Sequence, residues 1–277
     1  MILCMNTSIK KILAASLIVA GFGVGIYFNR VRIKQIWINL MKEDSSQAVP
    51  YSQAKNGSVK SAEDGLPSED SKAAPSGWPS VIANGEQAIP ERYNLAVPFT
   101  SQAPFKVWDE IHKDACEEAS VMMAARYIRG KPINSAVDAD EEILALIEWQ
   151  KENFGYWKDT DALKTAEILK RYYGFKNTGV VYDIGLNDIR KEIMVGHQVI
   201  VPAAGRLLNN PFYTPPGPLY HMLVVRGYTK DKIITNDPGT KNGENYAYAN
   251  QIFYDALHDW NGGDVTRGRR AMIVVRK

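Results

Sequence analysis

The sequence predicts an α+β fold for the region after about residue 90, with helices first and strands after them. Apolar residues recur with the period of a helix over residues 116–128, 140–152, 160–172 and 186–195. Apolar, β-branched runs follow at 199–201, 221–228, 232–236 and 271–275. Helices followed by strands with short connections favour an antiparallel sheet with the helical part packed on it.

Particular residues support the second and third of these predicted helices. In the second helix, Ile143, Leu146, Ile147 and Gln150 lie on one face, and acidic residues occupy the first turn. Thr160 or Asp161 can cap the third helix, and Gly174 can end it. A short extended segment at residues 95–99 precedes all of them.

The N-terminal 42 residues predict a membrane anchor and a juxtamembrane segment. Residues 12–28 are apolar or weakly polar, with lysines before them and Arg30, Arg32 and Lys34 directly after. A cleaved signal peptide is the alternative, but no convincing cleavage motif follows the run. The flanking charges are nearly balanced, so they give no orientation.

Residues 43–90 predict a flexible polar linker. Ser, Ala, Lys, Glu, Asp, Gly and Pro dominate this stretch, and such a composition buries too little apolar surface to offset the entropy of ordering. The folded domain is therefore expected over residues 91–277, held away from a membrane by the linker.

Composition excludes several classes of protein. The formal net charge is +2, and no stripe of basic and aromatic residues is present, so we expect no nucleic-acid partner. The two cysteines, Cys4 and Cys116, lie on opposite sides of the apolar run, which rules out a disulfide scaffold. An unpaired cysteine in an exported domain indicates chemistry.

Cys116 is the candidate nucleophile. It begins the helix at 116–128, where the helix dipole and free N–H groups favour the thiolate. We therefore expect a lowered thiol pKa. A buried core cysteine is the competing interpretation, because free cysteine is among the most buried residue types.

His221 is the candidate base. It begins a strand after a loop rich in Pro and Gly, where catalytic side chains are often held. Asp237 and Asn236 end the next strand, so a hairpin brings one of them to the imidazole. The Asn-Asp-Pro-Gly sequence is also good turn chemistry in its own right.

Two further residues complete the candidate site. Gln102, in an extended segment upstream of the cysteine, has a side-chain amide that can donate to an oxyanion. Trp108 is expected to line the substrate cleft. His112 with Asp114 and Cys116 does not form a recognised metal-binding pattern, so we expect no metal and no cofactor.

The segments VPFTSQAPF, DACEEASVMMAARYI and HMLVVRGY followed by NDPGT resemble the papain-like peptidases related to bacteriocin leader processing, cysteine peptidase family thirty-nine. The resemblance covers about residues 95–277. It implies a papain-like cysteine peptidase fold, Cys116 as nucleophile, His221 as base, Asp237 as its orienting residue and Gln102 in the oxyanion hole. Ala115 departs from the family, which commonly has glycine before the cysteine.

The expected function is thiol-dependent hydrolysis of peptide bonds by a membrane-tethered, extracytoplasmic cysteine peptidase, acting on a peptide or protein substrate. A secreted enzyme is the alternative location. An amidase of cell-wall peptides and a non-catalytic, tethered peptide-binding module are the alternative functions. The full Cys, His, Asp and Gln set argues against the binding module.

Overall fold

The computed structural model describes residues 88–276. The predicted anchor and nearly all of the predicted linker lie outside this part of the chain. Between residues 88 and 276, no helix is both long enough and apolar enough to cross a membrane.

The described chain alternates between helices and strands after an opening helical section. The longer helices are α3 (Cys116–Ile128), α4 (Ala136–Phe154), α5 (Ala162–Arg171), α6 (Leu186–Met194) and α7 (Asn250–Ala256). Short 3₁₀ turns are η2 (His112–Asp114), η3 (Gly205–Leu208) and η4 (Val265–Arg267). The strands are β1 (Tyr93–Asn94), β2 (Thr178–Tyr182), β3 (Gln198–Ala204), β4 (Tyr220–Tyr228), β5 (Lys232–Asn236), β6 (Tyr246–Ala249) and β7 (Ala271–Val275).

The strands form one antiparallel sheet in the order β2-β7-β3-β4-β5-β6, with β1 added along β4. β3 and β4 lie in its centre, and every residue of both is buried. A bulge between Val225 and Gly227 shifts the register of β4 against β5. β4 is therefore held by β3 from Tyr220 to Val225 and by β5 from Val224 to Tyr228, apart from the bulge.

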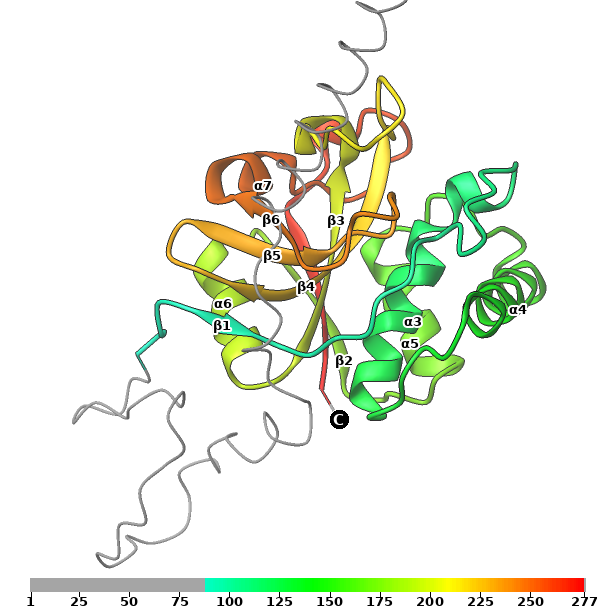
Figure 1. The fold of residues 1–277 in the computed structure, drawn as a ribbon, viewed down its shortest axis with the longest axis horizontal. Helices are drawn as coiled ribbons and strands as arrows, with labels where there is room; N and C mark the ends of the chain where they lie inside the picture. Colours follow the sequence, from blue (N-terminus) through cyan, green and yellow to red (C-terminus); the bar gives the residue numbers. More distant parts are fainter. Residues whose placement is uncertain (1–87, 277) are drawn as a thin grey trace, which may run out of the picture. The chain divides into compact units, whose positions relative to one another are not determined.

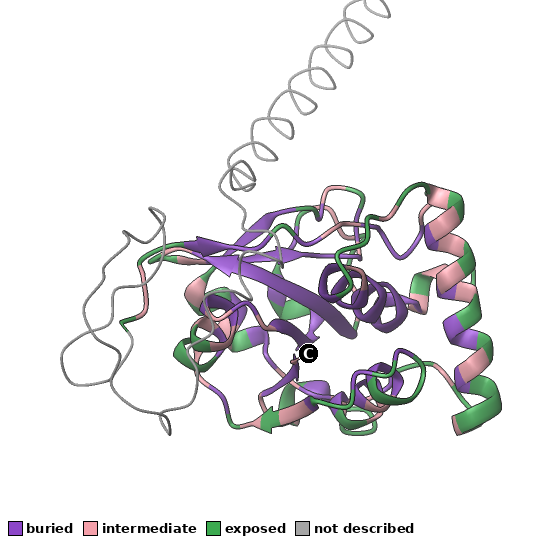
Figure 2. Ribbon diagram, turned by 90° about the horizontal axis from the view of Figure 1, so that it is seen from below, coloured by how far each residue is buried: buried purple, intermediate pink, exposed green. Residues whose placement is uncertain are grey.

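The helices cover the sheet on both sides (Figure 1). α3 packs against β3 and β4, and its outer side is covered by α4 and α5, while α6 packs on β3 and β4 from the other side. The burial of the residues agrees with this arrangement. α3 and the central strands are buried along their length, while α4 is exposed on one side (Figure 2). α3 is thus a core helix and its first residue is held firmly.

The predicted α+β fold is confirmed. The predicted limits of the first helix and the last strand agree with those of α3 and β7. The second helix begins four residues earlier than predicted, because Ser135 caps it by accepting a hydrogen bond from the Asp138 N–H. Asp161, one of the two predicted caps, caps α5 in the same manner.

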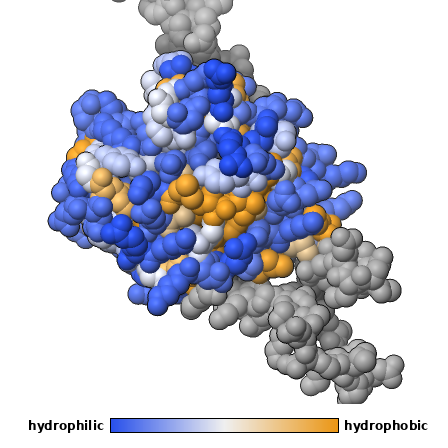
Figure 3. Space-filling model, turned by 180° about the vertical axis from the view of Figure 1, so that it is seen from behind, coloured by the Kyte–Doolittle hydropathy of each residue, from blue (hydrophilic) through white to orange (hydrophobic). Residues whose placement is uncertain are grey.

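The strands β2 and β6 are among the elements that the sequence did not predict. β2 pairs with β7, almost a hundred residues further along the chain, and its outer face is partly exposed. His258 lies after the end of α7 (Asn250–Ala256), where its Nδ1 contacts the Gly268 carbonyl at 2.7 Å. On the face seen in Figure 3 most of the surface is hydrophilic, and apolar side chains gather near its centre.

Candidate active site

The N-terminus of α3 positions Cys116. Ala115 is the N-cap and offers no side-chain hydrogen bond, so the first N–H groups of the helix are not capped in the usual way. The backbone N–H of Met222 in β4 donates to the cysteine sulfur. One turn later, the Ser120 hydroxyl donates to the Met222 carbonyl at 3.1 Å. Met222 therefore ties the start of α3 to β4 directly beside His221.

β4 positions His221, whose side chain is almost fully buried. Val224 lies opposite Asn236 in the β4–β5 pair. Continued by one residue, this register places Asp237 opposite Leu223, on the same face as His221. The Nε2 atom of His221 contacts Asp237 Oδ1 at 2.8 Å. The bond to Nε2 leaves Nδ1 as the ring nitrogen available to a thiol.

Asn236 lies on the opposite face and has a different set of partners. Its Nδ2 donates to the carbonyls of Val97 and Pro98, both at 3.1 Å, and its Oδ1 accepts from the buried Arg226 at 3.2 Å. Asn236 thus anchors the segment that leads to Gln102. Of the two residues left open by the sequence, the structure places Asp237 against the imidazole.

Asp237 is fully buried and is surrounded by hydrogen-bond donors. The Tyr213 hydroxyl donates to Oδ2 at 2.7 Å and Asn210 Nδ2 donates to it at 2.9 Å, with the Tyr248 hydroxyl also donating to Oδ2. Burial opposes ionisation, but the charge of His221 and these hydrogen bonds outweigh it and lower the pKa of Asp237. The group is therefore a carboxylate suited to stabilising an imidazolium.

The residues around Asp237 were missed at the sequence level. Tyr213 belongs to the Pro-rich loop before β4, and its ring lies edge-on to the His221 ring with centroids 5.4 Å apart. Gly239 lies against the same two rings: a Cβ there would be 2.9 Å from His221 Cε1 and 2.9 Å from Tyr213 Cε1. These contacts depend on how the loops before β4 and after β5 fold over the imidazole, so no local sequence pattern indicates them.

The environment of the Cys116 thiol differs from the predicted one. The thiol donates to Glu117 Oε2 at 3.0 Å, and Glu118 is also fully buried. Burial, and after it the charge of Glu117, raise the pKa of the Cys116 thiol well above its ordinary value. The expectation of a lowered pKa from the helix N-terminus is not met, because burial of the thiol and, after it, the neighbouring acids Glu117 and Glu118 raise that pKa.

Gln102 lies close to the start of α3, but its amide is already engaged. Nε2 donates to the carbonyls of His112 and Lys113, both at 2.9 Å, while its own backbone N–H donates to Pro238 at 2.9 Å. Both amide hydrogens therefore bind the turn η2 just before Cys116. Gln102 thus stabilises the turn that precedes Cys116. Its assignment to the oxyanion hole stays a prediction.

The other residues considered from the sequence lie outside this centre. Trp108 is 45% exposed in the loop before η2, and its role as cleft wall stays a prediction. His112 lies between Asp109 and Asp140, with ring nitrogens 2.8 Å from each carboxylate. Within residues 88–276, no three His, Cys, Asp or Glu side chains are arranged to hold a metal ion.

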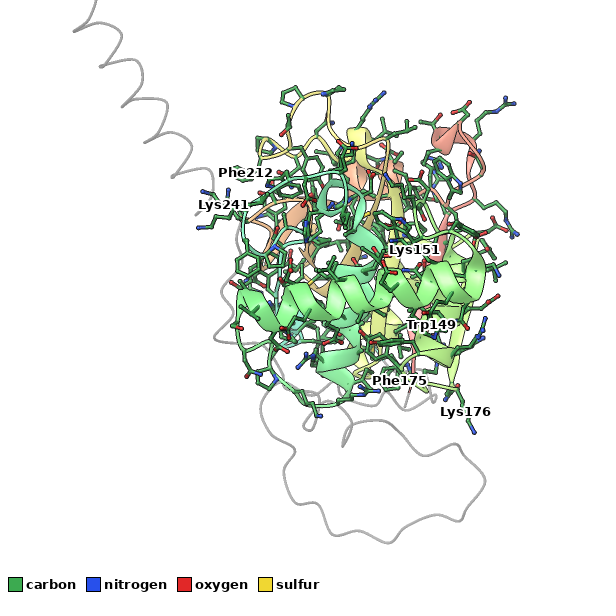
Figure 4. All side chains as sticks on the ribbon, turned by 90° about the vertical axis from the view of Figure 1, so that its right-hand side faces the viewer. Trp149, Lys151, Phe175, Lys176, Phe212 and Lys241 are labelled. Carbon is green, nitrogen blue, oxygen red and sulfur yellow. The ribbon has the colours of Figure 1, made fainter. Side chains whose placement is uncertain are left out.

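A cavity of about 250 Å³ adjoins the Gln102 segment. Figure 4 shows Lys241 at the end of the molecule where α4 begins. The cavity is bounded by the residues on either side of Gln102, by the residues that lead into α4, and by two lysines: Phe99, Thr100, Ser101, Ala103, Pro104, Lys106, Ile133, Asn134, Ser135, Ala136 and Lys241.

Comparison with known proteins indicates the family to which the chain belongs. The model of the Peptidase_C39-like family matches residues 94–262, a range that contains Gln102, Cys116, His221 and Asp237. A crystal structure of a Bacillus anthracis protein classed as a C39-like peptidase is similar, with a TM-score of 0.47 and 16% identity over 68% of this chain and 99% of that one. No curated protein matches the chain. Because the family model covers more than half of the sequence and confirms the resemblance found in its motifs, the chain belongs to the Peptidase_C39-like family.

Proposed function

We propose that this protein is a cysteine peptidase in which Cys116 is the nucleophile, His221 the general base and Asp237 the residue that orients the base. One observation carries the proposal. The cysteine sulfur accepts the N–H of the residue after His221, while His221 is bonded through Nε2 to a buried carboxylate. In enzymes that transfer acyl groups to a thiol, the nucleophile lies beside a base, and a third group orients that base.

In the first step, the Cys116 thiol gives its proton to Nδ1 of His221 and the sulfur attacks the peptide carbonyl carbon. Asp237 stabilises the imidazolium through Nε2. The tetrahedral intermediate collapses with cleavage of the C–N bond, and the imidazolium gives its proton to the leaving amine. A thioester on Cys116 remains.

In the second step, His221 takes a proton from water, and the resulting hydroxide attacks the thioester carbonyl. The S–C bond breaks, and the thiol regains its proton from the imidazolium. The backbone N–H of Cys116, at the first position of α3, and the Gln102 amide are the proposed oxyanion donors. The second of these requires the amide to release one of its two carbonyl partners when substrate binds.

The experiment is digestion of an unbiased peptide library by the full chain, with product termini read by mass spectrometry. Purified cell-wall fragments form a parallel arm, and Cys116→Ala is the control in both. New peptide termini in the library arm, absent with Cys116→Ala, support a peptidase. Products confined to the cell-wall arm would replace it with an amidase, and no product in either arm would leave a peptide-binding module.

We also propose that the catalytic domain is tethered to a membrane and lies outside the cytoplasm. The support is the apolar run at residues 12–28, its basic flanks and the polar linker that follows. The full chain should remain with membranes during carbonate extraction. A mature protein found in the soluble fraction with a new N-terminus near residue 23 or 25 would instead show signal cleavage.

A further inference from the structure

Two buried acids directly follow the candidate nucleophile. Glu117 is 1% exposed and Glu118 is 0% exposed. Glu117 Oε2 contacts the Cys116 sulfur at 3.0 Å, and Glu118 accepts a hydrogen bond from the buried amide of Gln150 in α4. One oxygen of each carboxyl group has no partner. Acids this deep destabilise a fold relative to apolar residues of the same size, so a role in packing does not account for them.

The surroundings of Glu117 oppose its ionisation. Burial, and after it the charge of Glu118, raise the pKa of Glu117 well above its ordinary value, although its bond to Cys116 and its own backbone N–H act in the other direction. The pKa of Glu118 is raised to about 7. The titratable groups that act on the pair come from α3, from the loop before α5, from η2 and from β4: Cys116, Asp159, Asp114 and Tyr220.

The proton on Glu117 decides the direction of its bond to the sulfur. A neutral carboxyl group can donate its O–H to sulfur and so stabilise a thiolate. A carboxylate can only accept, so it holds the S–H in place and repels a thiolate. The 3.0 Å contact is compatible with both protonation states of Glu117. Through this direct contact, the ionisation of Glu117 can act on the Cys116 sulfur.

We propose that Glu117 is a positioning residue for Cys116, which permits transfer of the thiol proton to His221 while it is protonated and blocks that transfer once it ionises. Glu117 keeps its own proton throughout the reaction, so the acid is not consumed. The charge of the neighbouring Glu118 helps to keep the proton on Glu117. This regulation rests on the proposed function of the same site, and it makes the peptidase one that loses activity as pH rises.

The test is the pH dependence of Cys116 alkylation by iodoacetamide in the full chain, from pH 5 to 9.5. Peptide mapping reads Cys116 separately from Cys4. In the wild type, the alkylation rate should fall by roughly tenfold or more as Glu117 ionises. A fall of this size corresponds to the loss of one charge-assisted hydrogen bond to the thiolate. In Glu117→Gln, the amide donates at every pH and the fall should be absent.

Two further variants separate this role from a structural one. Glu117→Ala lacks the donor, so its alkylation at pH 6 should be roughly tenfold slower than that of the wild type, whereas Glu117→Gln should keep the wild-type rate there. Glu118→Gln removes the neighbouring charge, so the fall should remain but move to lower pH. A merely structural Glu117 would change the melting temperature without these shifts.

Identical pH profiles for the wild type and Glu117→Gln would overturn the inference, as would a fall that Glu118→Gln does not move. Alkylation does not depend on a peptide substrate. If the protein hydrolyses peptides but the pH profile of Cys116 alkylation is the same in Glu117→Gln as in the wild type, only this inference is overturned. The predicted alkylation profiles without peptide hydrolysis would support it as a property of the thiol and would overturn only the proposed function.

Discussion

At the scale of single residues, the site depends on which side chain reaches His221. The register of β4 against β5 places Asp237 on the face of His221 and Asn236 on the other. A one-residue difference in a strand moves a side chain to the opposite face of the sheet. Asp237 and Asn236 are therefore expected to differ completely in their mutational effects, although they are adjacent in sequence.

Asp237→Ala should lower kcat strongly, and Asp237→Asn should lower it less, because an amide oxygen still accepts the imidazole N–H. Asn236→Ala should leave kcat nearly unchanged and lower the melting temperature, since it releases the Val97 and Pro98 carbonyls. Steady-state kinetics and thermal unfolding of the three variants provide the measurement. An inactive Asn236→Ala beside an active Asp237→Ala would contradict the assignment.

The lowered pKa of Asp237 also predicts a dependence of stability on pH. A group with a lowered folded-state pKa contributes its full stabilisation above the pKa of the unfolded chain, about 3.9 for aspartate. That contribution is lost as pH falls from there through the folded-state value. Acid titration of the melting temperature should show a loss in this range that is absent in Asp237→Asn.

Gln102→Ala should lower kcat by about 10²–10³ with little change in KM, the usual cost of one lost oxyanion donor. It should also lower the melting temperature, because the amide holds the His112 and Lys113 carbonyls in this substrate-free structure. Kinetics and thermal unfolding of the same preparation separate the two effects. An unchanged kcat with a lowered melting temperature would leave Gln102 only as a brace of η2.

At the scale of elements, the loop after β5 closes over the imidazole at Gly239. Gly239→Ala introduces a Cβ 2.9 Å from His221 Cε1, so the ring must move. Since a displacement of about 1 Å can cost about 10²-fold in rate, kcat/KM should fall by at least tenfold while the fold is kept. Gly179→Ala in β2 is the matched control, because its Cβ meets its nearest neighbour only at 3.7 Å.

The sequence predicts the elements whose signals are local. Cys116 at the start of a helix, the buried face of α4 and the Asp161 cap can all be seen within a few residues of sequence, and the structure has them. β2 and β6 were missed because short strands are fixed by partners elsewhere in the sheet. The depth of Glu117 was missed for the same reason. A glutamate in the first turn of a helix is ordinary, and only the packing of α3 under its neighbours buries it.

At the scale of the whole molecule, the described chain from residue 88 onward holds the complete sheet, its covering helices and all four predicted catalytic residues. A protein beginning near Pro90 should therefore fold, remain soluble without detergent and keep the kcat/KM of the full chain. Circular dichroism and peptide hydrolysis of the two forms provide the comparison. A tenfold loss of activity in the shorter form would assign a catalytic contribution to the N-terminal segment.

The central claim is that Cys116 forms a covalent thioester during peptide hydrolysis. The most direct measurement is rapid acid quenching of the full chain with a cleaved peptide, followed by intact-mass analysis and mapping of the modified residue. We predict an acyl adduct on Cys116 in the wild type, and neither adduct nor hydrolysis in a folded Cys116→Ala variant. Hydrolysis by Cys116→Ala at the wild-type rate would contradict the account, because the bond would then be broken without this thiol.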